Sequence, residues 1–479
     1  MLMRILGFKA LSVLAVILTL AMLTVACGGN SINTASNTQG NAQNSGSAAK
    51  PTENDAKPTE DDASVEGINI ELGANGPVEI DFWHIQATIY GEAIKEMVAD
   101  FNKKYEGKIK VNEVFQGSYA DLNQKLRAAL QGGGLPAISM ANEGDTLQYM
   151  KADQIVALEP YINDPKYGLT KEEVDDILPA VLDRQRIAAY EGKTMSWPHG
   201  NSSLGIYYNK EILKKAGYDA PAKTWKEFEE QALDIYKKTG IPALVIGNGK
   251  GYGSHSWSFL TSLATYGVEP IKYDLSGVDM DNEYSVELLT IFKNLLDQGA
   301  ILVGEDTEQE FTNGRAAMEL GTTARTTSKL DLIKDKFEWS ITLIPQGDPS
   351  KPSTSLGGGN QVLFKSTPEE QLAGWIFLKY FAGPEGQAIY GARTGYFPAS
   401  LSAQEIPVLA DDYKANPQKQ QAFEEIFPYA KAPAATAASG VINDAVNTLI
   451  LNVYAGKASP ADALKSLHAE STKLLEENK

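Results

Sequence analysis

Residues 78–140 read VEIDFWHIQATIYGEAIKEMVADFNKKYEGKIKVNEVFQGSYADLNQKLRAALQGGGLPAISM and alternate between two hydrophobic periods. Apolar side chains recur at every second position in residues 78–83 and 108–115, which predicts strands. They recur every three or four positions in residues 89–104 and 119–130, which predicts helices. A short apolar run at 136–140 predicts a third strand. This strand–helix order predicts an α/β sheet with helices on its faces.

The same kinds of pattern continue towards the C-terminus. We expect strands at 205–209 and 244–247, and helices at 225–239, 257–266, 286–298, 441–454 and 460–478. Within these patterns some aromatic residues are expected in the core, namely Phe82, Trp83, Trp225, Trp339 and Trp375. Tyr207 and Tyr208 are expected to divide between core and surface.

Composition limits the classes of protein to which the chain can belong. Its 479 residues are 43% hydrophobic, and about 400 globular residues exceed one ordinary core, which favours two domains. A net charge of −18 disfavours binding to nucleic acid. A single cysteine excludes an intramolecular disulfide and a thiolate-rich metal site. We expect neither a metal nor a cofactor.

The N-terminus has the layout of a secretory signal. Arg4 and Lys9 precede the apolar run 11–22, and residues 23–26 lead into Cys27, the only cysteine. This arrangement resembles a bacterial lipobox, in which the cysteine is lipidated (with palmitate among its acyl groups) and becomes the first mature residue. Thr24 stands where such motifs favour leucine. The alternative is an uncleaved membrane anchor, for which the apolar run is short.

A polar segment follows the cysteine. Residues 28–76 contain hardly any large apolar side chain, and no aromatic residue occurs between Phe8 and Phe82. Such a segment cannot bury enough surface to offset its chain entropy. We therefore expect a signal peptide at 1–26, and a lipidated cysteine with a disordered linker at 27–76. The globular head would be lipid-anchored at the extracellular face of the cell membrane, or at the periplasmic face in an organism with two membranes.

Catalytic and metal-binding motifs are incomplete in this sequence. It contains no zinc-protease helix motif and no phosphate loop. The segment 200–204 misses the nucleophile elbow, because Leu204 stands where the second glycine is needed. The segment 279–283 begins like a calcium loop, but Tyr284 replaces the glycine of its turn. We expect a binding protein, not an enzyme.

Several stretches, in this order, carry a resemblance to a known family. They are Phe82–His84 with Phe101–Asn102, Gln116–Tyr119, Gly134–Ile138, Trp197–Lys210, Lys223–Phe228, Phe311–Met318, Gly357–Asn360 and Thr394–Pro398. Together they resemble family 1 extracellular solute-binding proteins, the receptors of ABC importers. The similarity covers about residues 78–475, and it is closest to the glycerol-3-phosphate-binding and oligosaccharide-binding branches.

The resemblance implies a periplasmic-binding-protein-like fold: two α/β lobes joined by hinge segments, with the ligand cleft between them. By that pattern, lobe 1 comprises 78–200 plus 355–397, and lobe 2 comprises 203–352 plus 400–479. The hinges would lie near 200–204, 352–356 and 398–401. Such a receptor is expected to be a monomer that delivers its ligand to ABC transporter permease subunits.

Candidate ligand-binding residues follow from the chemistry of sugars and from this resemblance. Aromatic faces stack on the C–H patches of sugars, while carboxylates, amides and hydroxyls bind their hydroxyl groups, and an unmatched buried polar atom costs about 1–3 kcal/mol. The candidates are His84, Tyr119, Glu143, Trp197, Asn201, Ser202, Trp257, Thr322, Arg325, Gly358, Gly359, Asn360, Arg393 and Tyr396. Each also has a structural interpretation, as a core aromatic residue, a hinge turn or a surface charge.

The expected ligand is a neutral saccharide or polyol. Receptors for glycerol-3-phosphate carry an arginine near their C-terminal helices, whereas residues 433–440 of this chain contain no cation. Because Arg325 or Arg393 could replace it, glycerol-3-phosphate or a glycerophosphodiester remains an alternative ligand. More remote alternatives are a surface-anchored glycan hydrolase that uses Glu143, and an adhesive lipoprotein.

Overall fold

The computed structural model describes residues 67–248 and 255–478. The chain divides into two units, of which the second, Ser64–Lys479, contains all the described residues. The predicted signal peptide, Cys27 and the linker up to residue 66 lie outside the described residues. The second unit contains both hydrophobic clusters described below. Because it has its own core, residues 64–479 are expected to fold as an independent body.

The first described residues make ordered contacts with the body of this unit. The backbone N–H of Ile68 donates to the Asp164 carboxylate at 2.6 Å, and the Tyr167 hydroxyl donates to the Ile70 carbonyl at 2.8 Å. Leu72 packs against the first hydrophobic cluster. Contacts with the body therefore begin before Val78, within the segment expected to be linker.

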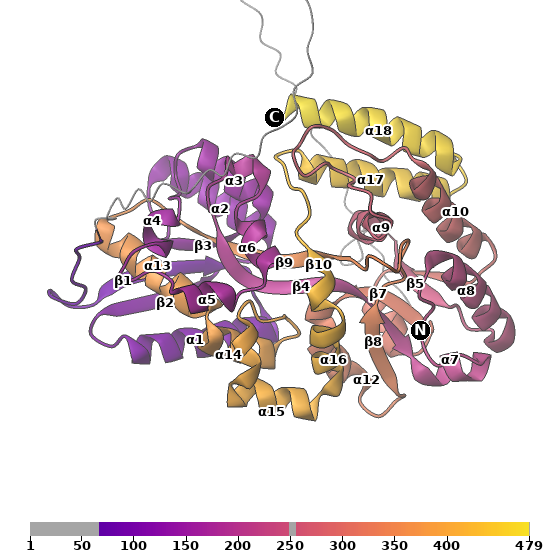
Figure 1. Ribbon diagram of the computed structural model, residues 1–479, viewed down its shortest axis with the longest axis horizontal. Coiled ribbons are helices and arrows are strands. Elements are labelled where there is room, and N and C mark those ends of the chain that lie inside the picture. Colours follow the sequence, from indigo (N-terminus) through magenta and orange to yellow (C-terminus); the bar gives the residue numbers. More distant parts are fainter. Residues whose placement is uncertain (1–66, 249–254, 479) are drawn as a thin grey trace, which may run out of the picture. The chain divides into compact units, whose positions relative to one another are not determined.

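The predicted N-terminal α/β order is confirmed. The elements are β1 (Val78–His84), α1 (Thr88–Lys104), β2 (Ile109–Phe115), α2 (Tyr119–Gly132) and β3 (Ile138–Ala141). β1 pairs in parallel with both β2 and β3. A capping box between Ser118 and Asp121 fixes the start of α2. These elements occupy the left half of Figure 1.

The chain then crosses the molecule in β4 (Trp197–Asn209), after a series of short helices: α3 (Glu143–Lys151), α4 (Glu159–Ile162), α5 (Lys171–Asp175), α6 (Pro179–Gln185) and η1 (Ala188–Tyr190). Every residue of β4 is buried. The second α/β region follows: α7 (Lys210–Ala216), α8 (Trp225–Thr239), β5 (Leu244–Gly247), α9 (His255–Ala264), α10 (Glu283–Asp297), β6 (Ile301–Gly304), α11 (Thr307–Thr312), β7 (Met318–Thr322), η2 (Thr323–Arg325), α12 (Thr326–Ile333) and β8 (Trp339–Leu343).

The chain returns through β9 (Thr354–Leu363), which crosses beside β4 in the centre of Figure 1. The remaining elements are mainly helical, as predicted: α13 (Pro368–Ala382), α14 (Pro384–Arg393), η3 (Leu401–Glu405), α15 (Pro407–Ala415), α16 (Pro417–Glu425), η4 (Phe427–Tyr429), β10 (Ala430–Lys431), α17 (Ser439–Tyr454) and α18 (Pro460–Glu477). The order β2-β1-β3-β9-β4-β7-β5-β6 places the two crossing strands in the middle of the sheet.

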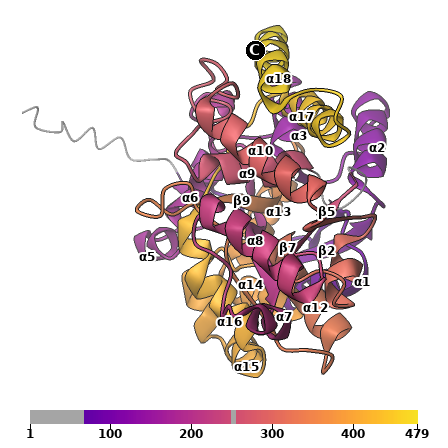
Figure 2. The ribbon, with the colours of Figure 1, turned by 90° about the vertical axis from the view of Figure 1, so that its right-hand side faces the viewer.

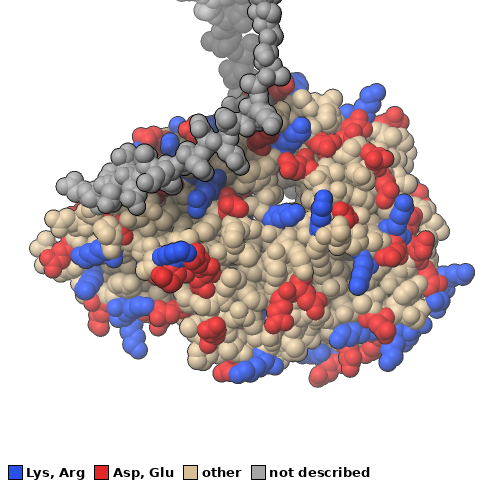
Figure 3. Space-filling model, viewed as in Figure 1, with Lys and Arg blue, Asp and Glu red and all other residues tan. Residues whose placement is uncertain are grey.

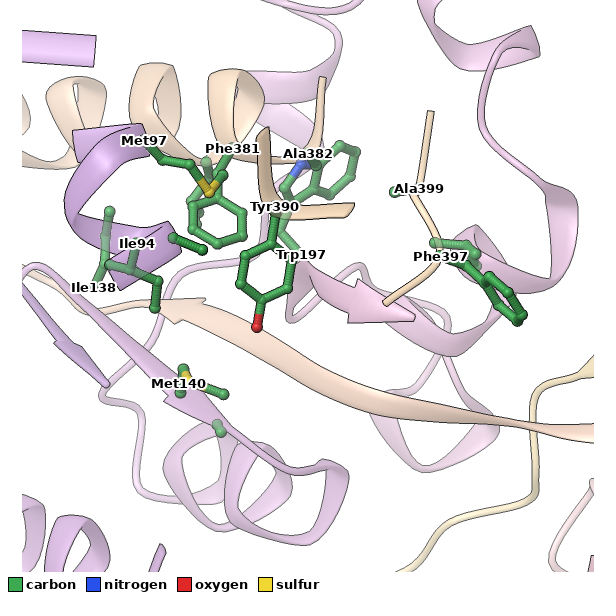
Figure 4. Packing of buried hydrophobic residues seen from close by; sticks show 14 of the residues in the cluster. Ile94, Met97, Ile138, Met140, Trp197, Phe381, Ala382, Tyr390, Phe397 and Ala399 are labelled. Carbon is green, nitrogen blue, oxygen red and sulfur yellow. The ribbon is translucent and has the colours of Figure 1, made fainter. Parts of the chain in front are cut away.

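The described residues form two hydrophobic clusters, of which the first also takes in Tyr207, Phe311 and Trp339 from the second α/β region, and this arrangement agrees with the predicted two-lobed α/β fold. The first cluster includes Phe82, and Figure 4 shows Met97, Trp197 and Phe381 from the same cluster with their neighbours. The second lies among α8, α10, α17 and α18, and Figure 2 shows α8 and α10 in front of β5 and β7. Residues 399–435 contribute to the first cluster and residues 438–475 to the second. The lobe boundaries given above stay a prediction.

The predicted core aromatic residues are largely confirmed, with one correction. Phe82, Trp225, Trp339 and Trp375 are buried, and Trp83 is half-buried. Tyr207 and Tyr208 are both buried, so the prediction that they divide between core and surface is wrong. The reason is that β4 is a central strand, covered on both faces. Among the described helices, none is long and apolar enough to cross a membrane.

We predict that Gly358→Ala destabilises the protein by about 3 kcal/mol or more. Gly358 has a φ of +117°, and an added Cβ would lie 1.9 Å from the carbonyl oxygen of Gly200. Urea unfolding of residues 64–479 measures the effect. Gly132→Ala is the matched control, because nothing lies within 4 Å of its added Cβ. Equal stability of both variants would contradict the close packing of β4 on β9.

Candidate ligand-binding site

The crossing of β4 and β9 brings several sequence-predicted residues together. Asn201 pairs with Gly358, and Ser202 pairs with Gly357, in an antiparallel ladder. Gly357 and Gly359 are two residues apart in one strand, so their Cβ positions lie on the same face. The glycines leave that face open for side chains from neighbouring elements.

Glu143 lies at the first position of α3, directly after β3, and its carboxylate is 16% exposed. Its Oε1 accepts hydrogen bonds from Nε of Arg184 and from Nδ2 of Asn360, the latter at 3.2 Å. Nη2 of Arg184 donates to the carbonyl oxygen of Gly358 at 2.8 Å. A buried ion pair thus links α3 and α6 to the glycine segment of β9.

Electrostatics keep this carboxylate ionised. Burial raises the pKa of Glu143. The Arg184 guanidinium and the Asn360 amide lower it by more than burial raises it, so the net pKa is below the usual value for glutamate. Arg184 is 5% exposed, and its remaining terminal nitrogen, Nη1, is buried and has no hydrogen-bond partner among the described residues. The pair is nearly neutral as a unit and retains one unused donor.

Three aromatic residues lie against the crossing strands. The Tyr119 hydroxyl is 3.4 Å from the position that a Cβ would take on Gly359, and Trp257 Cζ2 is 3.3 Å from that position on Gly357. The Tyr396 ring lies 2.9 Å from that position on Gly200. Burial raises the pKa of Tyr119, and Tyr396 and Glu143 raise it further.

Thr322 and Arg325 lie at the end of β7 and in η2, in the second region. The carbonyl oxygen of Ala324, between them, accepts a hydrogen bond from Tyr90 of α1 at 3.1 Å. Thr327 donates to the carbonyl oxygen of Thr394 at 2.7 Å. Arg325 itself donates to Glu308 at 3.1 Å. Helix α1 of the first α/β region therefore meets η2 of the second region, and the end of α14 meets α12, beside Tyr396. The Tyr396 ring contacts the Tyr90 ring edge to face.

Three predicted residues lie apart from this group. Trp197 is 1% exposed and packs edge to face on Trp375 in the first cluster, where Figure 4 shows it. Arg393 is half-exposed and holds Glu96 in a two-point ion pair. Trp197 belongs to the β4–β9 ladder, but its side chain packs in the first cluster, and Arg393 lies outside the ladder, so neither side chain joins this group.

His84 is the third, and it is buried at the end of β1. Its Nε2 lies 2.8 Å from the Glu113 carboxylate, and its Nδ1 accepts from the Gln86 backbone at 3.2 Å. Burial lowers the pKa of His84, against the opposing effect of Glu113. Burial likewise lowers the pKa of the neighbouring His199, to about 3. Both histidines are therefore neutral at pH 7, and His84 has a structural environment.

We define the crossover site as Tyr119, Glu143, Arg184, Trp257, Gly357–Asn360 and Tyr396. Sequence reasoning missed Arg184, because a charged residue in a short helical segment is typical of a solvated surface. Only the ion pair with Glu143, which is 41 residues away in sequence, reveals its role. Among the described residues, no group of three His, Cys, Asp or Glu side chains could hold a metal ion.

Comparison with known proteins identifies the family. A family model described as bacterial extracellular solute-binding protein matches residues 96–421. The chain belongs to this family. Members are solute-binding receptors, so this chain is a receptor and not an enzyme, and the hydrolase alternative is not supported.

Individual relatives agree with this assignment. The chain is 23% identical to the sn-glycerol-3-phosphate-binding periplasmic protein UgpB of Pectobacterium atrosepticum, over 84% of this chain and 92% of that protein. It is 26% identical to the UgpB of Rhizobium meliloti, over 72% of this chain and 81% of that protein. These similarities agree with the glycerol-3-phosphate and oligosaccharide branch of the family.

Solved structures share the fold. The cyclic alpha-maltosyl-1,6-maltose binding protein of Arthrobacter globiformis superposes with a TM-score of 0.73 at 23% identity, covering 84% of this chain and all of that one. UgpB of Mycobacterium tuberculosis, in complex with glycerophosphocholine, superposes with a TM-score of 0.70 at 19% identity, covering 84% of this chain and 99% of that one. At these identities the likeness establishes the architecture.

We predict that Arg184→Met destabilises residues 64–479 by about 3–5 kcal/mol at pH 7, because it leaves Glu143 buried without its counter-ion. The loss is smaller at pH 4. Without the guanidinium, burial raises the pKa of Glu143 above its unfolded value, so the variant loses stability as the pH rises through about 4 to 7. Urea unfolding at both pH values measures this difference.

The matched control is Arg315→Met, which removes an exposed guanidinium from Glu310. A surface pair of this kind contributes about 1 kcal/mol or less. If Arg184→Met lost the same stability at pH 4 and at pH 7, Glu143 would not be the group that Arg184 keeps ionised.

Proposed function

We propose that this receptor captures a neutral saccharide or polyol at the crossover site and delivers it to the permease of an ABC importer. The observation that carries the proposal is the buried Glu143–Arg184 pair beside aromatic side chains. A carboxylate bound at one oxygen and a guanidinium with one unused nitrogen offer an acceptor and a donor together. Vicinal hydroxyl groups present the complementary pattern.

The charge balance favours a neutral ligand over a phosphate. The positive charge of Arg184 is already offset by Glu143, and Arg325 donates to Glu308. An anionic group at 4 Å from the Glu143 carboxylate would be opposed by about 4 kcal/mol in a partly buried setting. On the face shown in Figure 3, acidic and basic residues are interspersed, without an extended basic area.

The aromatic residues supply the second part of sugar recognition. Trp257 is half-buried beside Gly357, and Tyr119 is half-buried beside Gly359. Rings in such positions stack on the C–H faces of a pyranose, while Ser202 and Asn360 add polar groups at the same strands. Two stacked faces with several hydrogen bonds are compatible with micromolar affinity, about −8 kcal/mol.

Ligand binding would favour a closed arrangement of the two lobes. The contacts Tyr90–Ala324 and Thr327–Thr394 join elements that belong to different lobes under the proposed boundaries. A ligand that contacts Trp257 and Glu143 at once stabilises the arrangement in which both are in reach. We further propose that lipidated Cys27 tethers the receptor, as a monomer, to the outer face of the membrane.

One observation favours glycerol-3-phosphate or a glycerophosphodiester as the second candidate ligand. Nη1 of Arg184 has no hydrogen-bond partner in the described parts of the chain, and an arginine with an unused nitrogen can bind a phosphate group. The UgpB proteins named above bind glycerol-3-phosphate or glycerophosphocholine. Glu143 must then be protonated or displaced from Arg184 for the phosphate to enter.

Thermal unfolding of residues 64–479 against a ligand panel tests the proposal. The panel contains neutral mono- and oligosaccharides, polyols, glycerol-3-phosphate and its diesters. A ligand at 100 times its dissociation constant adds about 2.7 kcal/mol, which raises the Tm by several degrees. We expect a shift with one class of neutral ligand. A rise in Tm with phosphorylated ligands alone would contradict the proposal of a neutral ligand.

We predict that Glu143→Gln reverses the charge preference of the site. Loss of the carboxylate removes a charged hydrogen bond and weakens the neutral ligand by about 1.5–3 kcal/mol, at least tenfold. It also leaves Arg184 unneutralised, so that glycerol-3-phosphate binds more tightly than to the unmodified chain. Isothermal titration with both ligands measures the change.

Two further variants distinguish an effect of the charge at residue 143 from a general loss of folding. Glu310→Gln removes an arginine-paired carboxylate outside the crossover site and is expected to change neither affinity. The double variant Glu143→Gln/Arg184→Met keeps the site neutral and is expected to gain no affinity for phosphate. If Glu143→Gln weakened both ligands equally, the ion pair would not set the charge preference.

A further inference from the structure

A cavity of about 790 Å³ lies in the first lobe, away from the crossover site. Its wall is formed by the end of α1, by α13, by the start of α14 and by the segment around α5. Of the residues predicted to bind ligand, only Trp197 lines it. Its volume is in the range of about 300–1,000 Å³ typical of small-molecule sites.

The inner wall of this cavity is apolar and well buried. Ile109, Ile177, Trp197 and Ala382 are all buried, while Tyr105, from the end of α1, is half-buried at its side. Burial raises the pKa of the Tyr105 phenol. Such a wall accommodates an aromatic or aliphatic body of limited size.

The rim of the cavity carries four lysines, of which two are already paired. Lys104 pairs with Glu385, and Lys379 with Glu173 at 2.9 Å. Lys108 and Lys166 are exposed and form no ion pair with any residue that the structure describes, and Lys166 lies over the Tyr167 ring. Tyr167 and the carboxylate of Glu71, which also lines the cavity, raise the pKa of Lys166, so Lys108 is the cation most available to an anionic group at the rim.

The start of α14 adds to the attraction for an anion. Gly383, Pro384 and Glu385 line the cavity, and this ten-residue helix begins at Pro384 without a side-chain cap. The positive end of the helix dipole therefore lies at the cavity wall, where Pro384 has no N–H to donate and the Glu385 carboxylate pairs with Lys104. The carboxylate of Asp176, by contrast, is occupied by hydrogen bonds from Ser400 and Ser402.

We propose that this cavity is a second binding site, for an amphipathic molecule with an apolar body and one anionic group. The body lies against Tyr105, Ile109 and Ile376, and the anion lies at the rim near Lys108 and Lys166. The cavity shares no residue with the crossover site, so we expect the two sites to bind their ligands separately.

Fluorescence titration of residues 64–479 with anilinonaphthalene sulfonate tests the proposal, since this probe joins an aromatic body to one anionic group. We expect saturable one-to-one binding. Ile376→Trp fills the cavity and should weaken binding at least tenfold. Ile389→Trp, which alters a partly buried isoleucine of the same cluster that does not line the cavity, should leave binding unchanged.

A double variant, Lys108→Ala/Lys166→Ala, changes exposed residues only and tests the charge. It should weaken the sulfonate probe several-fold but not the uncharged analogue phenylnaphthylamine. Trp257→Ala, in the crossover site, should have no effect on either probe. Probe binding that Trp257→Ala abolishes, or that survives Ile376→Trp, would overturn the proposal, as would the absence of saturable binding.

Discussion

The close antiparallel packing of β4 on β9 is the constraint on which the rest of this structure depends. Gly358 approaches the carbonyl oxygen of Gly200 so closely that a side chain would overlap it. The same ladder carries the chain from one hydrophobic cluster to the other and back. The flanking glycines, Gly357 and Gly359, leave the other face of the strand bare, and Tyr119 and Trp257 lie against that face. A single packing requirement therefore joins the lobes and shapes the site between their elements.

Electrostatics give this site its chemical character. A carboxylate in a buried position is costly unless a cation compensates it, and Arg184 meets this need for Glu143. The guanidinium also binds the Gly358 carbonyl, so that the ion pair and the strand crossing support each other. A site with internally balanced charges distinguishes ligands by hydroxyl pattern and shape, with little attraction for anions. This is the physical basis for preferring a neutral ligand.

Much of the fold follows from periodicity, whereas the site does so only in part. β1, α1, α8 and β5 agree with the predicted bounds to within a residue, because their apolar spacing is regular and local. β4 is longer than predicted, since its first half is polar and gains its strand structure only by pairing with β9. Glu143 and Trp257 could be nominated from sequence, whereas Arg184 could not, because its partners are 41 and 174 residues away. Trp197 has the right chemistry for stacking, but packing against Trp375 places it elsewhere.

A crystal structure of residues 64–479 with the solute that most raises its melting temperature would test the central claim most directly. The account predicts that the solute lies against Trp257 and Tyr119, with a hydroxyl group hydrogen-bonded to the Glu143 carboxylate. It also predicts that Arg184 remains bound to that carboxylate. A solute found away from the β4–β9 crossing, or one whose anionic group has displaced Glu143 from Arg184, would contradict the account.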